Sequence, residues 1–379
     1  MDFGLTAEQA ALRERVETFC SAHCTEEHAA ALDRESRYPV ELHRALAESG
    51  LLGWCLPAAY GGAGGSPIDA CIINERLGRC SSAATNLLFI NGVSAALIAL
   101  AGSEAQKEEY VRGVAEGRLR FVFALTEPGA GSDAAAIASR AVRDGDAYIV
   151  QGTKLYTTGA LDADYILTVV RTRPEGKASR GTSLLIVPRT APGLAVAPLE
   201  KIAGNCIASC RVEYDGVRVD AGQRLGPEDG AWSILMIGAG LERLTVAASS
   251  VGLARAVLEE VTAHVTTREQ FGQPVSRFQA VQHQLADIAT EIDAMELLTY
   301  RAAWMAAQGM ARPKEISMAK LYCSERLSEI VLRGMRLLGG GAYFTETPMP
   351  RRVREAMLAL YAGGTVEIQR NTIAKSLGL

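Results

Sequence analysis

The chain has 379 residues, of which 48% are hydrophobic and 22% charged, the usage of an ordinary soluble globular protein. Its formal net charge of -4 and its pI near 5.9 argue against a nucleic-acid partner or an anionic membrane surface. A chain of this length exceeds one hydrophobic core, so two or three domains are expected. The most apolar run, 95–100, is too short to span a bilayer and is interpreted as a core helix. The N-terminus shows no signal-peptide pattern, which predicts a cytoplasmic protein outside any membrane.

The first predicted domain, residues 1–118, has the periodicity of helices. The segment 6–9 has the pattern of a capping box, and apolar residues follow it at helical spacing through Phe19. Pro39 fits the first turn of a further helix that ends near Gly50, and Ser66 with Pro67 can begin another.

Eight cysteines raise the question of metals and disulfides. Cys20, His23, Cys24 and His28 have the spacing of one face of a single helix. One helix rarely closes a tetrahedral zinc site without ligands from elsewhere, so we predict no metal. Buried, reduced thiols that act as small hydrophobic residues are the preferred interpretation.

In the second predicted domain, residues 119–225, the sequence pattern is that of short strands. β-type runs are divided by Asp-Gly or Pro-Gly turns, and no helices separate them. Repeated short strands without helices between them predict an antiparallel barrel or sandwich and not a doubly wound sheet. The Rossmann glycine fingerprint is missing from the sequence. The runs are 147–150, 165–170, 183–187 and 210–214.

The third predicted domain, residues 226–379, is helical again. Long segments suit an antiparallel four-helix bundle, which makes the fold class α+β and mostly α. The segments are about 231–266, 277–308, 313–338 and 350–362.

The most informative segment is 121–133, in which an apolar strand ends in Thr-Glu-Pro-Gly followed by Ala-Gly-Ser-Asp. Such a turn exposes backbone amides and lets a flat polar ligand approach the main chain. The segment resembles the flavin-binding signature of the acyl-CoA dehydrogenase family, and the block 152–159 resembles that family's second flavin-contacting strand. The order of helices, small β domain and helices is that family's architecture, and the resemblance spans essentially the whole chain.

The resemblance implies that FAD is the cofactor. Thr126 matches a threonine that binds the flavin pyrimidine, Thr158 one that approaches the reactive N5 edge, and Ser132 a serine near the flavin and the thioester. Tyr156 stands where many relatives place a tryptophan against the flavin ring, and a tyrosine still stacks there. Further cofactor contacts implied by the same motif are Phe123, Leu125 and Gly131.

A second set of cofactor contacts is implied to reach the FAD of a neighbouring subunit or its adenosine half. It consists of Arg268, Phe271, Gln279, Arg336, Gly339, Gly340, Thr365 and Glu367. Arg336 replaces the usual glutamine, and an arginine can still bind pyrophosphate with two hydrogen bonds. The resemblance therefore implies a homotetramer built as a dimer of dimers.

The catalytic base departs from the commonest family pattern. Removing an α-proton from an acyl thioester requires a carboxylate at the α-carbon, and many relatives carry this glutamate at the position of Gly363. A smaller group, including isovaleryl-CoA and long-chain acyl-CoA dehydrogenases, places it at the position of Glu242. We predict Glu242 as the base, with the Gly363 backbone N–H as a donor to the thioester oxygen. The structural alternative is that Glu242 pairs with Arg243.

The implied substrate is an acyl-CoA, and the implied electron acceptor is electron-transfer flavoprotein or another redox partner. Ser132, Gly240 and Arg243 are the expected substrate contacts. Gly240 replaces an aspartate that relatives acting on coenzyme A often carry, so an acyl- or aminoacyl-carrier-protein thioester stays open. A reductase and an inactive partner subunit also stay open.

Overall fold

The computed structural model describes residues 4–173, 180–310 and 313–379, and it divides into two compact units. Unit 1 joins the N-terminal segment through Asp33 with Ser66–Thr85 and Glu242–Leu379. Unit 2 joins Arg34–Gly65 with Asn86–Leu241. The fold is mostly helical with one mixed sheet in the middle of the chain, which confirms the predicted fold class.

The N-terminal helices of unit 1 begin where the sequence predicts. Helix α1 (Ala7–His23) is capped by Thr6, whose hydroxyl accepts from the Gln9 N–H at 3.2 Å while the Gln9 side chain accepts from the Thr6 N–H. Helix α4 (Pro67–Cys80) has the same reciprocal cap between Ser66 and Asp69. Both predicted starts are confirmed, because capping is decided by neighbouring residues alone.

Helix α1 ends before the last of the four cysteine and histidine residues that were predicted to share one helical face. It ends at His23, and α2 (Glu26–Arg34) begins after Thr25, whose hydroxyl accepts from the His28 N–H at 3.2 Å. His28 therefore belongs to a second helix, and the prediction of one continuous face is wrong.

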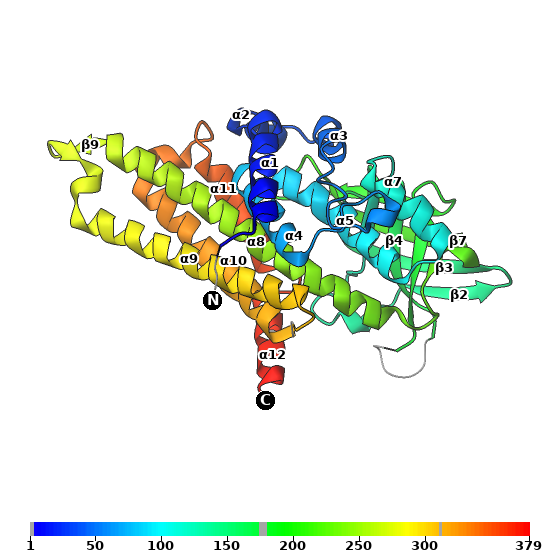
Figure 1. The fold of residues 1–379 in the computed structure, drawn as a ribbon. Coiled ribbons are helices and arrows are strands. Elements are labelled where there is room, and N and C mark those ends of the chain that lie inside the picture. The colour runs from blue at the N-terminus through cyan, green and yellow to red at the C-terminus, as the bar shows by residue number, and fades with distance from the viewer. Residues whose placement is uncertain (1–3, 174–179, 311–312) are drawn as a thin grey trace. The chain divides into compact units, whose positions relative to one another are not determined.

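The long helices of unit 1 pack around a shared apolar core (Figure 1). They are α8 (Ala231–Thr267, in unit 1 from Glu242), α9 (Gln279–Ala307), α10 (Pro313–Leu338) and α11 (Met349–Ala356). Helix α12 (Val366–Ser376) packs against α10. The predicted helix 350–362 is wrong at its end. α11 stops at Ala356, a 3-10 turn covers Met357–Leu360, and α12 starts after Thr365.

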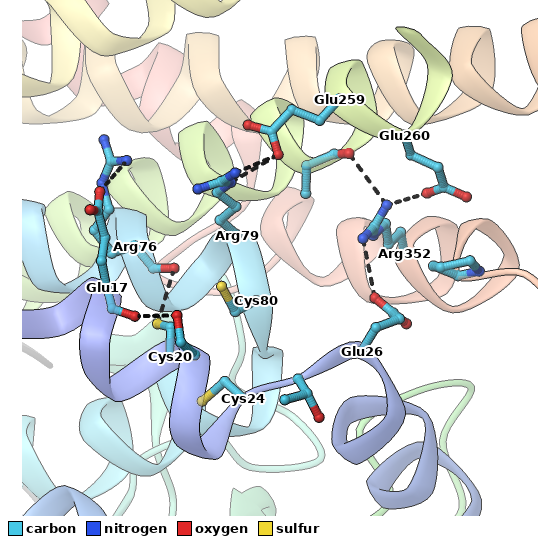
Figure 2. Close-up of a pocket in the computed structure, with 14 residues that line it drawn as sticks. Glu17, Cys20, Cys24, Glu26, Arg76, Arg79, Cys80, Glu259, Glu260 and Arg352 are labelled. Atoms are coloured by element: carbon cyan, nitrogen blue, oxygen red, sulfur yellow. Dashed lines mark hydrogen bonds and ion pairs between the residues drawn. The ribbon is translucent and has the colours of Figure 1, made fainter. Parts of the chain in front are cut away.

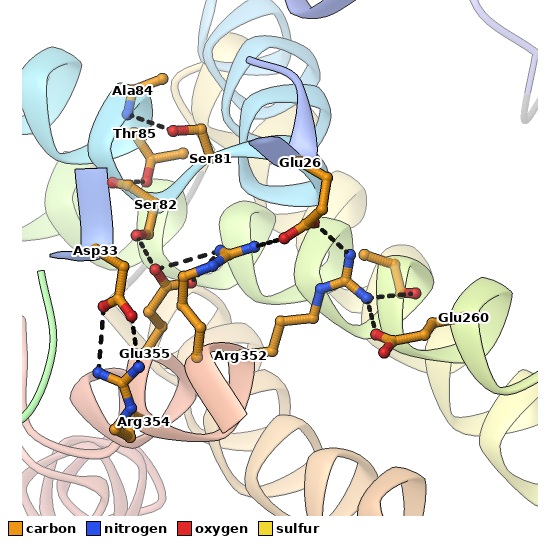
Figure 3. Close-up of polar contacts among 12 residues, drawn as sticks. Glu26, Asp33, Ser81, Ser82, Ala84, Thr85, Glu260, Arg352, Arg354 and Glu355 are labelled. Atoms are coloured by element: carbon orange, nitrogen blue, oxygen red, sulfur yellow. Dashed lines mark hydrogen bonds and ion pairs between the residues drawn. The ribbon is translucent and has the colours of Figure 1, made fainter. Parts of the chain in front are cut away.

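Ion pairs tie α2 to α11 within unit 1 (Figure 3). Glu26 pairs with Arg351 and with Arg352, which also pairs with Glu260 of α8. A separate ion pair joins the same two helices, since Asp33 pairs with Arg354 at 2.6 Å. The pairing offsets the cost of burying Arg351, which is only 7% exposed.

Unit 2 contains α3 (Val40–Glu48), most of α5 (Ser82–Ala101), α6 (Glu104–Gln106) and α7 (Arg112–Ala115). The apolar run 95–100 belongs to α5, a helix of 20 residues, so the expectation that no apolar segment reaches bilayer length is wrong. By length and composition α5 and α8 could each cross a membrane. About half of each apolar window is buried inside the protein, as in the core helices of globular domains.

The sheet of unit 2 has the order β6-β7-β3-β2-β4-β5-β8, with β1 paired to β4. Its strands are β1 (Phe121–Ala124), β2 (Arg140–Asp144), β3 (Ala147–Thr158), β4 (Tyr165–Arg171), β5 (Thr182–Pro188), β6 (Leu194–Leu199), β7 (Ser209–Asp220) and β8 (Arg224–Leu225). Most pairs are antiparallel, as predicted, but β1 and β2 run parallel to β4. The sheet is therefore mixed.

Candidate active site

The predicted flavin-contacting segments of unit 2 lie side by side. The Leu155 N–H donates to the carbonyl of Thr126 at 2.8 Å, and the Lys154 ammonium donates to the carbonyl of Leu125 at 3.0 Å. Phe123 lies half-buried on β1, immediately before this junction. The structure thus brings the end of β1 against β3, although the two were read as separate motifs.

A buried ion pair holds this junction. Lys154 is fully buried and its Nζ lies 2.7 Å from Glu127 Oε1. The same carboxylate accepts from the backbone N–H groups of Ala138 and Ser139 at 2.5 and 3.0 Å. Burial alone raises the pKa of Glu127, but Lys154 and these donors outweigh it and hold the pKa below its ordinary value. Burial lowers the pKa of Lys154 to about 8.

The surface beside this junction fits a planar ligand. Tyr156 has φ of 57° at a bulge in the β3–β7 pairing, and its side chain is 66% exposed. A non-glycine residue in that conformation is strained, and such strain concentrates at binding sites. No described atom lies within 4 Å of the Cβ positions above Gly129 and Gly131, and Ser132 follows on the exposed part of the same loop. An open loop beside an exposed aromatic ring suits the expected FAD.

Thr158, the last residue of β3, lies opposite Ser209 of β7. The two hydroxyl oxygens are 2.9 Å apart, and Ser209 Oγ is 3.3 Å from Lys201 Nζ. The Thr158 hydroxyl also lies 3.4 Å from the carbonyl of Tyr156. Its position is therefore set by two strands.

In unit 1, Glu242 and Gly363 face each other. A Cβ built on Gly363 lies 3.3 Å from Cγ and 3.5 Å from Cδ of Glu242. Glu242 is half-buried, and in the described part of the chain its carboxylate is in no ion pair. Burial raises its pKa, and Arg243, the Gly363 backbone and Lys320 oppose that rise only partly. A half-buried carboxylate without an ion-pair partner is costly to maintain and typical of a functional group.

Three side chains hold the turn that carries Gly363. Arg243 Nε donates to the Gly363 carbonyl at 3.0 Å, and Lys320 Nζ donates to the Gly364 carbonyl at 2.8 Å. Gln369 Nε2 donates to both carbonyls, at 3.1 and 2.9 Å. Arg243 therefore supports this turn, and the alternative interpretation of Glu242, an ion pair with Arg243, is not found among the described contacts.

The start of α12 follows this turn directly. The Thr365 hydroxyl accepts from the Ile368 N–H at 3.3 Å and caps the helix, and Glu367 is exposed in its first turn. Both predicted contacts of the adenosine half thus lie close in sequence to the Glu242 cluster of unit 1, which we define as Glu242, Arg243, Lys320, Gly363, Gly364 and Gln369. Gly240 lies one half-turn before Glu242 in α8.

The remaining predicted cofactor residues form no part of the Glu242 cluster among the described residues. Arg268 and Phe271 lie at the hairpin of β9 (Glu269–Gln270) and β10 (Gln273–Pro274), and Gln279 begins α9 (Figure 1). Arg336, Gly339 and Gly340 lie where α10 ends. All six are exposed, with Phe271 93% exposed and at a φ of 54°.

A separate cavity of about 610 Å³ in unit 1 contains no predicted site residue (Figure 2). Cys20, Cys24 and Cys80 line it, together with the ion pair of Arg79 and Glu259 at 2.8 Å. The cysteines are free thiols. The hydrogen bond with Cys24 and burial raise the pKa of Cys20 to about 12, although the Cys80 thiol opposes the rise. Across the described ranges, no cluster of three or more His, Cys, Asp or Glu side chains could hold a metal ion.

Sequence reasoning missed the residues that support both clusters. Lys154, Lys201, Lys320 and Gln369 were given no role, because a lysine or glutamine is usually solvated. One signal was present in α10, where Lys320 recurs with apolar residues on the buried face of the helix. A polar residue on an apolar helical face indicates a buried partner.

Three family models match the chain. They describe the N-terminal, middle and C-terminal domains of acyl-CoA dehydrogenases and match residues 6–118, 122–217 and 229–378.

Two curated relatives illustrate the range of activities. A protein of Bacillus subtilis described as probable acyl-CoA dehydrogenase YngJ is 34% identical, over 100% of both chains. Acryloyl-CoA reductase (NADH) of Anaerotignum propionicum is 32% identical, over 100% of this chain and 96% of its own.

Two solved structures share the fold over the full chain. The prolyl acyl carrier protein oxidase AnaB is 28% identical, with a TM-score of 0.93 over 99% of this chain and 100% of its own. The FAD complex of PigA is 27% identical, with a TM-score of 0.94 over 100% of both.

Proposed function

This chain belongs to the acyl-CoA dehydrogenase family, and we propose that it introduces an α,β double bond into an acyl thioester with Glu242 as the base. It is a flavoprotein oxidoreductase, and its cofactor is FAD. When bound, FAD accepts the hydride that leaves the β-carbon. We further propose three domains, 1–118, 119–225 and 226–379, whose limits lie close to those of the matched family models.

The contact between Glu242 and Gly363 carries this proposal. Family members place the catalytic carboxylate at one or the other of these two positions. A side chain starting at Gly363 enters the space that Glu242 fills, since the built Cβ lies 3.3 Å from Glu242 Cγ. Glu242 thus presents a carboxylate in the space that a glutamate side chain at position 363 would enter.

The residues around Glu242 suit proton abstraction. The thioester carbonyl acidifies the α-carbon, and a base with a raised pKa is better matched to that proton at neutral pH. Arg243, Lys320 and Gln369 occupy the carbonyl oxygens of the 363–364 turn. The turn is thereby fixed, and the Gly363 N–H serves as a donor to the thioester oxygen.

In unit 2, the residues on the β1–β3 junction hold the cofactor. Thr126 and Thr158 supply hydroxyl groups to the flavin, Tyr156 stacks on it, and Phe123, Leu125, Gly131 and Ser132 complete the wall. The strained φ of Tyr156 and the open loop at Gly129 and Gly131 support this assignment.

The proposed substrate is an acyl-CoA, and the proposed electron acceptor is electron-transfer flavoprotein or another soluble redox partner in the cytoplasm. Gly240 keeps the carrier-protein alternative open, and the likeness to a prolyl acyl carrier protein oxidase favours testing it. The likeness to an acryloyl-CoA reductase favours testing the reverse direction.

Anaerobic bleaching of the bound FAD by thioesters tests the proposal. The same acyl group is presented on coenzyme A and on a phosphopantetheinylated carrier protein, and absorbance near the flavin maximum is followed. We expect at least one acyl-CoA to bleach the flavin within a few seconds of manual mixing. Bleaching by the carrier-bound form alone selects the carrier alternative. A flavin that no thioester reduces, while enoyl thioesters oxidise the dithionite-reduced protein, selects the reductase.

Exchanging the carboxylate between the two facing positions is a second test. Glu242→Ala combined with Gly363→Glu is expected to reduce its flavin at least about tenfold faster than Glu242→Ala alone, because a positioned base contributes 10²–10⁴-fold. The rate stays below wild type, since the φ of 69° at position 363 is strained for glutamate. Gly363→Ala in the Glu242→Ala background is the matched control. Equal rates for the two double variants contradict the shared placement.

We propose that the enzyme is a homotetramer, a dimer of dimers, in which Arg268, Phe271, Gln279, Arg336, Gly339 and Gly340 contact the FAD of another subunit, while Thr365 and Glu367 contact its adenosine half. The 93% exposure and positive φ of Phe271 support this. Phe271→Ser is expected to lower both the tetramer fraction in sedimentation velocity and the FAD content per chain. A fully flavinated monomer, in the wild type or the variant, contradicts the assignment.

A further inference from the structure

A chain of three hydrogen-bonding groups ends on Thr158 within unit 2. The Lys201 ammonium donates to the carbonyl of Ile207 at 2.7 Å and to Ser209 Oγ at 3.3 Å. Ser209 Oγ is in turn 2.9 Å from Thr158 Oγ1. The antiparallel register that pairs Thr158 with Ser209 fixes the second contact.

The donor direction of the first contact in this chain follows from chemistry. An ammonium group has hydrogens to donate and no lone pair to accept with, so Ser209 Oγ must be the acceptor from Lys201. The single Ser209 hydroxyl proton is then available to Thr158 Oγ1. Either hydroxyl can donate in this contact. In the arrangement in which Ser209 donates, Thr158 accepts that bond and keeps its own proton for a third partner. Its protein acceptor, the Tyr156 carbonyl, is 3.4 Å away, at the limit of a hydrogen bond.

We propose that Lys201 is a positioning residue that, acting through Ser209, fixes the Thr158 hydroxyl as a hydrogen-bond donor toward the reactive edge of the bound flavin. The inference rests on the proposed function, which places Thr158 at that edge. Lys201 is not among the predicted cofactor contacts, but in this proposal it orients Thr158, which is one of them.

Lys201 also places a positive charge behind Thr158. It is half-buried, and in the part of the chain that the structure describes it is in no ion pair. Burial lowers the pKa of Lys201, and the only groups that oppose the shift are the thiols of Cys206 and Cys210. An uncompensated cation in a partly buried place favours negative charge developing nearby. We therefore expect Lys201 to make reduction of the bound cofactor more favourable.

The test is an equilibrium redox titration of the FAD-loaded enzyme against a reference dye, without substrate. Lys201→Met is expected to lower the ratio of reduced to oxidised flavin at a fixed poise about tenfold, which is ~30 mV for a two-electron couple. Lys201→Arg keeps the cation and recovers most of the ratio. Arg211→Met removes a positive charge from the exposed side of β7, where Arg211 pairs with Glu213, and leaves the ratio unchanged.

Two further variants separate the relay from charge alone. Ser209→Ala interrupts the chain while Lys201 remains, and it is expected to lower the ratio by a smaller factor. The double variant Lys201→Met with Ser209→Ala shifts the ratio by less than the sum of the single shifts, because groups in one network are coupled. Additive shifts, or an unchanged ratio in Ser209→Ala, overturn the relay, and this variant decides the matter if Lys201→Met loses its FAD.

Thr158→Val distinguishes the inference from the function on which it rests. If Thr158→Val lowers the ratio but Lys201→Met does not, the role of Lys201 is wrong and the cofactor site stands. If Thr158→Val itself leaves the ratio unchanged, Thr158 does not face the reactive edge, and the proposed cofactor placement fails with the inference.

Discussion

Glu242→Gln is expected to slow anaerobic flavin reduction by an acyl thioester about 10³-fold while the protein stays folded and yellow. The amide has nearly the shape of the carboxylate but is not basic at neutral pH. Substrate binding should be retained, because the proposed donor to the thioester oxygen is the Gly363 backbone. Rapid-mixing absorbance gives the rate, and the dependence on substrate concentration gives the affinity.

The pH dependence of the flavin reduction rate gives a further test of Glu242. Burial raises the pKa of Glu242, and the base works only when it is deprotonated, so the wild-type rate should rise with pH through that raised pKa. The acid limb should be absent in Glu242→Gln. Glu259→Gln on the same helix, where Glu259 pairs with Arg79 at the surface, is the control and keeps the wild-type rate. A Glu242→Gln variant that bleaches at the wild-type rate removes Glu242 from the mechanism.

Lys154→Met is expected to lower the free energy of unfolding by about 3–5 kcal/mol and to release FAD. The substitution leaves the carboxylate of Glu127 buried without its cation. It also removes the donor to the Leu125 carbonyl that joins the loop after β1 to β3. Urea denaturation followed by circular dichroism measures the first effect, and the FAD absorbance retained after gel filtration measures the second.

Two comparisons isolate the buried pair as the cause. Adding Glu127→Gln to Lys154→Met removes the orphaned charge and should recover part of the lost stability. Arg218→Met breaks exposed pairs with Asp144 and Asp146 in the same sheet and should change stability by less than about 1 kcal/mol. A Lys154→Met protein as stable as Arg218→Met and fully loaded with FAD refutes the structural role of the pair.

Local signals in the sequence predicted local structure. The caps at Thr6 and Ser66 depend on residues three positions apart, and both were placed correctly. The same kind of signal was overlooked at Thr25 and at Thr365, where a threonine caps a new helix. The helical period continues through both breaks, so periodicity alone merged α1 with α2 and extended α11.

Contacts between distant residues could not be predicted from pattern. Arg243 and Gly363 are 120 positions apart, and only the family resemblance linked Glu242 to Gly363. The parallel pairing of β1 with β4 depends on the whole sheet and left no trace in the short strand runs. Lys154 and Glu127 belong to the two flavin-binding motifs identified in the sequence. Their ion pair depends on the packing of β1 on β3, which a lysine in a strand does not predict.

The facing positions 242 and 363 also constrain how such enzymes can change over time. A lineage that moves its base from one position to the other by single substitutions must pass through a protein with both glutamates or with neither. With both, two carboxyl groups occupy neighbouring space, and like charges this close titrate together and retain a proton on one of them. With neither, the base is lost. Because the two positions share one space, glycine at 363 leaves that space to the Glu242 side chain in this chain.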